Sequence, residues 1–129
     1  MPNKDELDFE ICFYETLIKD KPDFVEALIP LGDAYTRKAE YRKGLEIDQR
    51  LTKLKPRDPT VFYNLACSYS LLKMKDAAIK ALKKAIELGY DDFDYLSTDK
   101  DLENIKTDKR FKQLLIKYIK TSYTSTSGE

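Results

Sequence analysis

A spacing of 34 residues recurs along this chain and constrains its fold more than any other feature. Large apolar, small and aromatic residues return at that interval in two segments: Leu28, Leu31, Gly32 and Tyr35 in the first, and Phe62, Leu65, Ala66 and Tyr69 in the second. A fixed period of this length is typical of helix-turn-helix repeats, in which each unit buries its apolar face only against its neighbours. We therefore expect a stack of helix pairs, and such a stack presents a groove that can bind a ligand.

Helical periodicity and terminal signals divide the repeated part into elements. Helices are expected over residues 4–20, 23–38, 41–55, 58–72 and 76–88. Asp23 followed by Glu26 resembles a capping box, and Asp58 followed by Pro59 is a strong helix start. Gly89 is expected to end the last of these helices in a left-handed conformation. In the first helix, the apolar side is expected to include Phe9, Phe13 and Leu17 on one line, widened by Ile11, Tyr14 and Ile18.

The segment after Gly89 departs from the period. A capping box at residues 98–101 predicts a short turn, and Thr107 or Asp108 is expected to start a last helix. Four residues lie on one side of that helix: Phe111, Leu114, Leu115 and Tyr118. We interpret it as a cap over the last apolar face of the stack. Residues 121–129 are polar without periodicity, which predicts a disordered tail.

The composition excludes several classes of function. The 129 residues include 23 basic and 23 acidic side chains, and this balance argues against a nucleic-acid or membrane-surface role. The sequence has no His, and its two cysteines fit no metal-ligand spacing. We therefore expect neither a bound metal nor a cofactor. No apolar run approaches the length of a membrane span, and no secretory signal pattern opens the sequence. We expect reduced cysteines and a cytoplasmic location.

The pattern of residues 9–90 resembles the tetratricopeptide repeat, whose fingerprint combines a large apolar residue, Leu-Gly and Tyr in the first helix with a closing proline. The resemblance implies an all-α fold, a right-handed α-solenoid of antiparallel helix pairs in a single domain over residues 1–120. It divides the chain into a half repeat at 4–22, full repeats at 23–56 and 57–90, and a cap at 91–120. The second repeat has Ala66 at the glycine position and Tyr90 at the proline position.

The second helix of the first repeat departs from the family pattern at Gly44 and Asp48, where the family prefers alanine and an aromatic residue. Glycine in a helix interior costs about 1 kcal/mol relative to alanine. We expect Asp48 to be partly solvated or to have a Lys or Arg partner. This helix is therefore predicted to be the least regular of the stack.

The resemblance also implies that the first helix of each unit lines a concave face. The residues it places there are Glu26, Ile29, Asp33 and Thr36 from the first repeat, and Thr60, Tyr63, Asn64, Cys67 and Ser70 from the second. Tyr63 and Asn64 are expected at the centre, as an aromatic anchor and an amide that both donates and accepts hydrogen bonds. The acidic Glu26 and Asp33 favour a ligand with basic side chains. The alternative is an ordinary solvated helix face.

These features predict a non-enzymatic protein–protein interaction module that binds a peptide or a partner's helix. The family's clamp for acidic chaperone tails is not expected, because Ile29 and Asp33 occupy positions where it needs basic and amide groups. The alternative function is architectural, as a self-associating segment of a larger protein or assembly. A monomer is expected, with a homodimer as the alternative.

Overall fold

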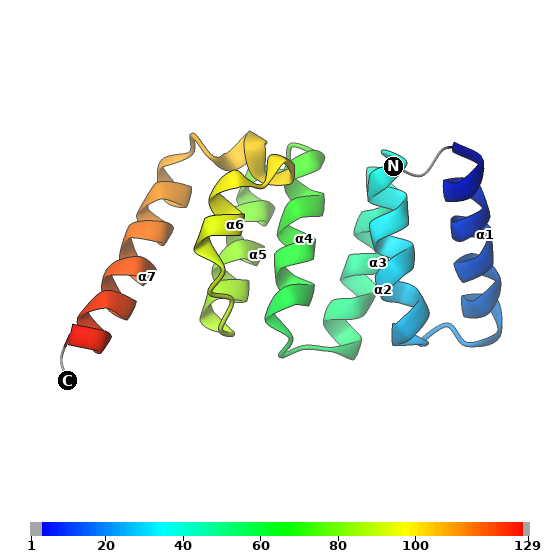
Figure 1. Ribbon diagram of the computed structural model, residues 1–129, viewed down its shortest axis with the longest axis horizontal. Coiled ribbons are helices and arrows are strands. Elements are labelled where there is room, and N and C mark those ends of the chain that lie inside the picture. The colour runs from blue at the N-terminus through cyan, green and yellow to red at the C-terminus, as the bar shows by residue number, and fades with distance from the viewer. Residues whose placement is uncertain (1–3, 128–129) are drawn as a thin grey trace.

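The structure is a computed structural model that describes the backbone of residues 4–127 and the side chains of residues 4–120. These residues form helices throughout, with no strand within 4–127. In chain order the elements are α1 (Lys4–Asp20), α2 (Val25–Arg37), α3 (Tyr41–Leu54), α4 (Pro59–Leu71), α5 (Lys75–Glu87), α6 (Phe93–Thr98), the 3₁₀ helix η1 (Lys100–Ile105) and α7 (Lys109–Ser127). Figure 1 shows them side by side in one stack, with α1 and α7 at opposite ends.

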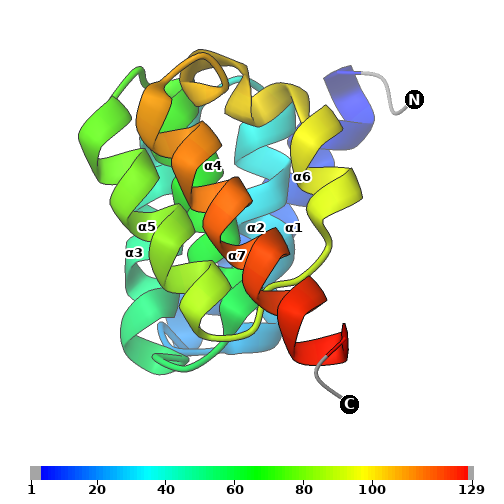
Figure 2. The same ribbon diagram turned by 90° about the vertical axis from the view of Figure 1, so that its left-hand side faces the viewer.

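Adjacent helices pack in pairs. Helix α2 packs on α3 and α4 packs on α5, while α1 contacts α2 and α3 contacts α4 across the boundaries between units. Figure 2 shows α3 and α5 on one side of the stack and α2 and α6 on the other. The predicted all-α stack of helix pairs is therefore confirmed. None of the described helices is both long enough and apolar enough to cross a membrane.

The repeated residues form the core of this stack. Leu31 and Ala66 are fully enclosed, Gly32 and Leu65 are buried, and Tyr69 is half-buried. The buried side chains fall into two clusters. One joins α1, α2 and α3 with Val61 at the start of α4, and the other extends from α4 through α7. Each unit thus buries its apolar face against its neighbours, as the 34-residue period predicts.

The helix ends follow local sequence signals in most places. The Asp58 carboxylate caps α4 by accepting hydrogen bonds from the backbone N–H groups of Thr60 and Val61. The capping box predicted at Asp23 is wrong, because α2 begins after Phe24 and has no side-chain cap. Lys21 instead turns the chain through its carbonyl oxygen, which accepts from the N–H of Phe24.

Three turns between helices close in the same way. A residue at the end of each helix adopts a positive φ: Ala39 (63°), Lys73 (61°) and Gly89 (114°). The next N–H then reaches back to the last turn of the helix, as Glu40 does to the carbonyl of Tyr35. Glycine relieves the steric cost of this conformation only at Gly89, where the predicted left-handed helix end is confirmed.

Small residues let α2 and α3 approach closely. A Cβ atom added at Gly32 would lie 3.2 Å from Asp48 Oδ1 and 3.2 Å from Ile47 Cγ2, and one added at Gly44 would lie 3.3 Å from Thr36 Oγ1. Close packing therefore compensates for the poor helix propensity of Gly44. Helix α3 is continuous over its 14 residues, so the irregularity predicted for it is not observed.

The buried side of α1 is only one part of the apolar side predicted for it. Leu7 and Ile11 are buried against α2, with Tyr14 and Ile18 packed beside them. Phe9 and Phe13, which were expected on the apolar side, are exposed. The helix is apolar on two faces, and periodicity alone does not indicate which face α2 covers.

The C-terminal elements cover the last repeat. Phe111 and Leu114 of α7 are buried in the cluster that contains α4 and α5, with Leu115 and Tyr118 packed against it. The backbone of α7 continues to Ser127, so the disorder predicted from residue 121 onward is not observed through that residue. No glycine or proline interrupts residues 109–127, and the hydrogen-bonded ladder can propagate through the Ser- and Thr-rich segment. Residues 128–129 lie outside the described part.

Candidate ligand groove

An open groove lies on the face of the stack formed by α2, α4 and α6. Its volume is about 480 Å³. The residues that line it are Ile29, Pro30, Gly32, Asp33 and Thr36 of α2, Asp48 and Leu51 of α3, Thr60, Tyr63, Asn64, Cys67 and Ser68 of α4, and Tyr90, Tyr95, Asp99 and Asp101 of the following segment. One wall thus comes from the first repeat, and the other comes from the segment after the last repeat.

Most of the residues predicted for the concave face line this groove. They are Ile29, Asp33, Thr36, Thr60, Tyr63, Asn64 and Cys67. Glu26 and Ser70 do not line it. Ser70 is fully buried, and its carbonyl oxygen accepts a hydrogen bond from the Asn104 side chain at 2.8 Å. That these residues bind a partner stays a prediction.

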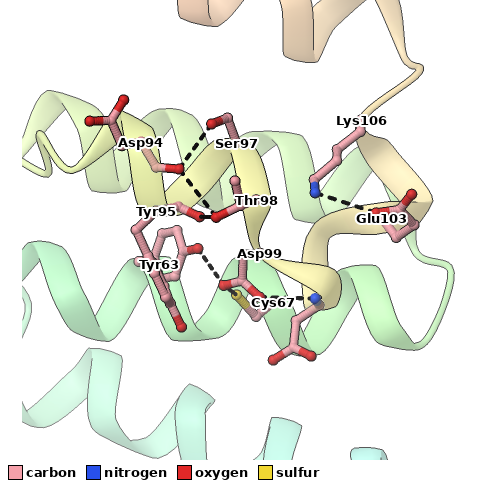
Figure 3. Close-up of polar contacts among 10 residues, drawn as sticks. Tyr63, Cys67, Asp94, Tyr95, Ser97, Thr98, Asp99, Glu103 and Lys106 are labelled. Atoms are coloured by element: carbon pink, nitrogen blue, oxygen red, sulfur yellow. Dashed lines mark hydrogen bonds and ion pairs between the residues drawn. The ribbon is translucent and has the colours of Figure 1, made fainter.

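Tyr63 is part of the groove wall and is not an exposed anchor. Its side chain is only 4% exposed, and its ring stacks on Tyr90 with centroids 4.3 Å apart and planes 3° from parallel. The Tyr63 hydroxyl donates a hydrogen bond of 2.5 Å to Asp99 Oδ2, which Figure 3 shows beside Cys67. Burial and this carboxylate raise the pKa of Tyr63. A ligand can touch the edge of this ring, but the ring is already packed.

The wall contributed by Tyr90, Tyr95, Asp99 and Asp101 was missed in the sequence. Tyr90 ends the second repeat and the other three follow it, where the 34-residue period no longer predicts which side chains face inward. Tyr90, at the position where the family has proline, was the one available signal. Tyr95 is exposed and lies 6.1 Å from Tyr63 between ring centroids, so it offers an accessible aromatic surface where Tyr63 does not.

The lining of the groove has acidic side chains and no basic ones. Asp33, Asp48, Asp99 and Asp101 belong to the lining, which contains no Lys or Arg. Asp33 accepts a hydrogen bond from Arg37 at 2.8 Å, which offsets part of its charge at the rim. Burial, followed by repulsion from Asp99, raises the pKa of Asp101. The groove is therefore an acidic surface that favours cations.

Asp48 lies at the floor of the groove, and both expectations for its side chain are wrong. Its side chain is buried, and the Ser68 hydroxyl donates a hydrogen bond to Asp48 Oδ2 at 2.5 Å. It is therefore neither solvated nor paired with the expected Lys or Arg. Burial raises the pKa of Asp48 from 3.8 to about 7, although the Ser68 hydrogen bond acts in the opposite direction. The carboxyl group changes its charge near neutral pH.

Replacing this carboxyl group should make stability less dependent on pH. Because the folded-state pKa lies above the unfolded value, the contribution of Asp48 to stability is full below about pH 4 and is lost as the pH rises to about 7. The loss amounts to roughly 4 kcal/mol. Asp48→Asn should therefore gain stability over the native protein at pH 8, and the gain should shrink toward pH 5. Urea denaturation midpoints of both proteins across this range measure the difference.

Asn64→Ala is the matched control, because it changes an exposed side chain of the same groove that does not titrate. Its difference from the native protein should change little with pH. A gain for Asp48→Asn that is equal at pH 5 and pH 8 would contradict the raised pKa.

One group of side chains in the described residues has the spacing that a metal ion would need. Cys67 Sγ and one carboxylate oxygen each of Asp99 and Asp101 lie within 4.8 Å of one another. Two of these groups already have partners in the fold, because Asp99 accepts from the Tyr63 hydroxyl, the Cys67 thiol and the backbone N–H of Asp101. Burial and the nearby carboxylates raise the pKa of the Cys67 thiol, so it is not a ready thiolate nucleophile or ligand.

Comparison with known proteins agrees with this architecture. Residues 59–89, which hold α4, the following turn and α5, match the model of the tetratricopeptide repeat family. The chain is also 34% identical over 87 residues to a protein of Arabidopsis thaliana whose name describes it as chloroplastic. That match covers 65% of this chain and 26% of the relative, so the chain spans about a quarter of the relative's length. Residues 59–89 are therefore similar to a tetratricopeptide repeat, and they lie in a stack of helix pairs of the kind that tetratricopeptide arrays form.

Proposed function

We propose that this chain is a protein-binding module whose groove takes a peptide segment or helix with basic side chains. Tetratricopeptide repeats generally mediate interactions between proteins, and they carry no catalytic chemistry of their own. The observation that supports the finer proposal is the lining of the groove, which has four aspartates and no basic residue. A cationic segment would gain Coulomb energy there, and an acidic one would be repelled.

The exposed side chains of the groove fit the rest of such a ligand. Ile29 on α2 and Tyr95 on α6 are exposed and supply apolar contact from opposite walls. Asn64, exposed on α4 between them, can donate to and accept from a peptide backbone. Since these side chains are not part of the packed core, a ligand can reach them without unfolding the stack.

The proposal predicts a preference for a basic peptide. The probes are two fluorescent peptides of equal length, one of alternating Lys and Leu and the other of alternating Glu and Leu. The Lys-containing peptide should bind, and fluorescence anisotropy should show a dissociation constant that rises with salt, because screening weakens charge–charge attraction. Asp33→Asn, and separately Ile29→Ala combined with Asn64→Ala, should weaken binding about tenfold, which is about 1.4 kcal/mol.

Glu46→Gln is the matched charge control. Glu46 is exposed on α3 and does not line the groove, so its removal should leave the affinity unchanged. If the groove variants bind the Lys-containing peptide as tightly as the native protein, or if the Glu-containing peptide binds equally well, the groove is not the binding site for basic segments.

A further inference from the structure

The outer face of α1 is apolar, although no helix within residues 4–127 covers it. Phe9 is 74% exposed and Phe13 is 50% exposed. Phe13 stands 34 residues before Ile47 and 68 before Ala81, and both of those residues are buried. Ile47 of α3 corresponds to Phe13, and it packs on Gly32 of α2, which is the first helix of the same repeat. Phe13 thus occupies a position that elsewhere in the stack contacts a neighbouring helix.

The opposite end of the stack has a second exposed apolar face. Helix α7 buries Phe111 and Leu114, but Ile116 is 64% exposed and Ile119 is 48% exposed. These two isoleucines are three residues apart and lie on the same side of the helix, away from the buried pair. Ile116 and Ile119 together form what we call the α7 face, and Phe9 and Phe13 together form the α1 face.

The charges around the two faces are opposite. Helix α1 contains six acidic and two basic residues, a net charge of −4, whereas α7 contains five basic and no acidic residues, a net charge of +5. Asp5 precedes Phe9 by four residues, and Lys112 precedes Ile116 by four residues, so each charge lies one helical turn from the apolar pair. Asp8 forms an ion pair with Lys38, and Glu10 forms one with Arg37, so these contacts join α1 to the C-terminal end of α2. Neither ion pair involves Asp5.

We propose that the α7 face of one copy of this chain docks on the α1 face of a second copy. The apolar pairs would bury each other, and the acidic flank of α1 would meet the basic flank of α7. The helices are of similar length, 17 and 19 residues, so they can pack along most of their length. Because α1 and α7 lie at opposite ends of the stack (Figure 1), the contact is head-to-tail and repeats from copy to copy. This contact between copies does not depend on the function proposed for the groove, and it leaves the groove uncovered.

Two blocked variants of the full chain test this arrangement. Phe9→Ser with Phe13→Ser removes the α1 face, and Ile116→Ser with Ile119→Ser removes the α7 face. Sedimentation velocity should show that the native chain forms dimers and larger species as its concentration rises, and that each variant alone stays a monomer. An equimolar mixture of the two variants should form a dimer and nothing larger, since it retains one intact pair of faces. Raising the salt to about 1 M, where the Debye length is about 3 Å, should weaken association.

Met74→Ser is the matched control, because Met74 is exposed but belongs to neither face. It should associate as the native chain does. A native chain that stays monomeric at every concentration would overturn the proposal. So would a symmetric dimer that survives the loss of the α7 face, or a mixture of the two variants that stays monomeric.

Exchanging two charges tests the same contact without the serine variants, in case one of them loses its circular-dichroism signal and is therefore unfolded. Lys112→Glu and Asp5→Lys should each weaken self-association. The chain that carries both changes should recover it, because the attraction between the two positions is restored with reversed signs. Failure of the double variant to recover association would count against the pairing of α1 with α7.

Discussion

Removing residues 107–129 is expected to destabilise the protein severely and to make it aggregate. The deletion takes away Phe111 and Leu114, which are buried against the last repeat. Burial of two side chains of this size is worth about 3–6 kcal/mol, a large part of the roughly 5–15 kcal/mol that stabilises a typical domain. It would also remove part of the apolar cluster to which the fully buried Leu102 and Ile105 belong.

A shorter deletion separates capping from chain length. Removing residues 122–129 keeps all the side chains within residues 109–120 that pack on the last repeat, from Phe111 to Tyr118. Its urea denaturation midpoint and its light scattering should stay close to those of the full chain. If the two deletions behave alike, α7 does not cap the stack.

Tyr63→Ala is expected to cost about 3–5 kcal/mol of stability, as large-to-small changes of buried aromatic residues do. The change removes the ring that stacks on Tyr90 and leaves a cavity beneath it. It also takes the hydroxyl donor away from the half-buried Asp99 carboxylate. Urea denaturation followed by circular dichroism measures the loss.

Two further variants show what that loss consists of. Tyr63→Phe keeps the ring and removes only the hydrogen bond to Asp99, so it should cost about 1–3 kcal/mol. Asn64→Ala changes the neighbouring exposed residue and should stay within about 0.5 kcal/mol of the native protein. If Tyr63→Ala and Asn64→Ala unfold at the same urea concentration, Tyr63 is the free surface anchor that the sequence alone suggests.

The contrast between these neighbours shows where sequence reasoning about the groove stops. The helical line from Ile29 to Thr36 and from Thr60 to Cys67 correctly predicts which residues of α2 and α4 line the groove. It does not predict that Tyr63 is covered, because Tyr90 and Asp99 lie 27 and 36 residues further along the chain, outside the helix that carries Tyr63. Local periodicity describes one helix at a time, and it contains no information on what packs against that helix.

The sequence by itself determined the architecture. The 34-residue return of Leu31, Gly32 and Tyr35 predicts stacked helix pairs, because only a residue that recurs at the same place in each unit can meet the same neighbour. The signals at Asp58 and Gly89 are also local, since a cap or a left-handed turn involves only the few residues around it.

Only the tertiary structure decided which of several apolar or polar surfaces each helix uses. Helix α1 has apolar residues on two sides, and contact with α2 selects Leu7 and Ile11 and leaves Phe9 and Phe13 exposed. Asp48 is buried because the approach of α2 at Gly32 closes the space above it, and Ser68 on the next helix supplies its hydrogen bond. Burial and hydrogen-bond partners depend on residues distant in the chain, and so do the pKa of Asp48 and the acidity of the groove.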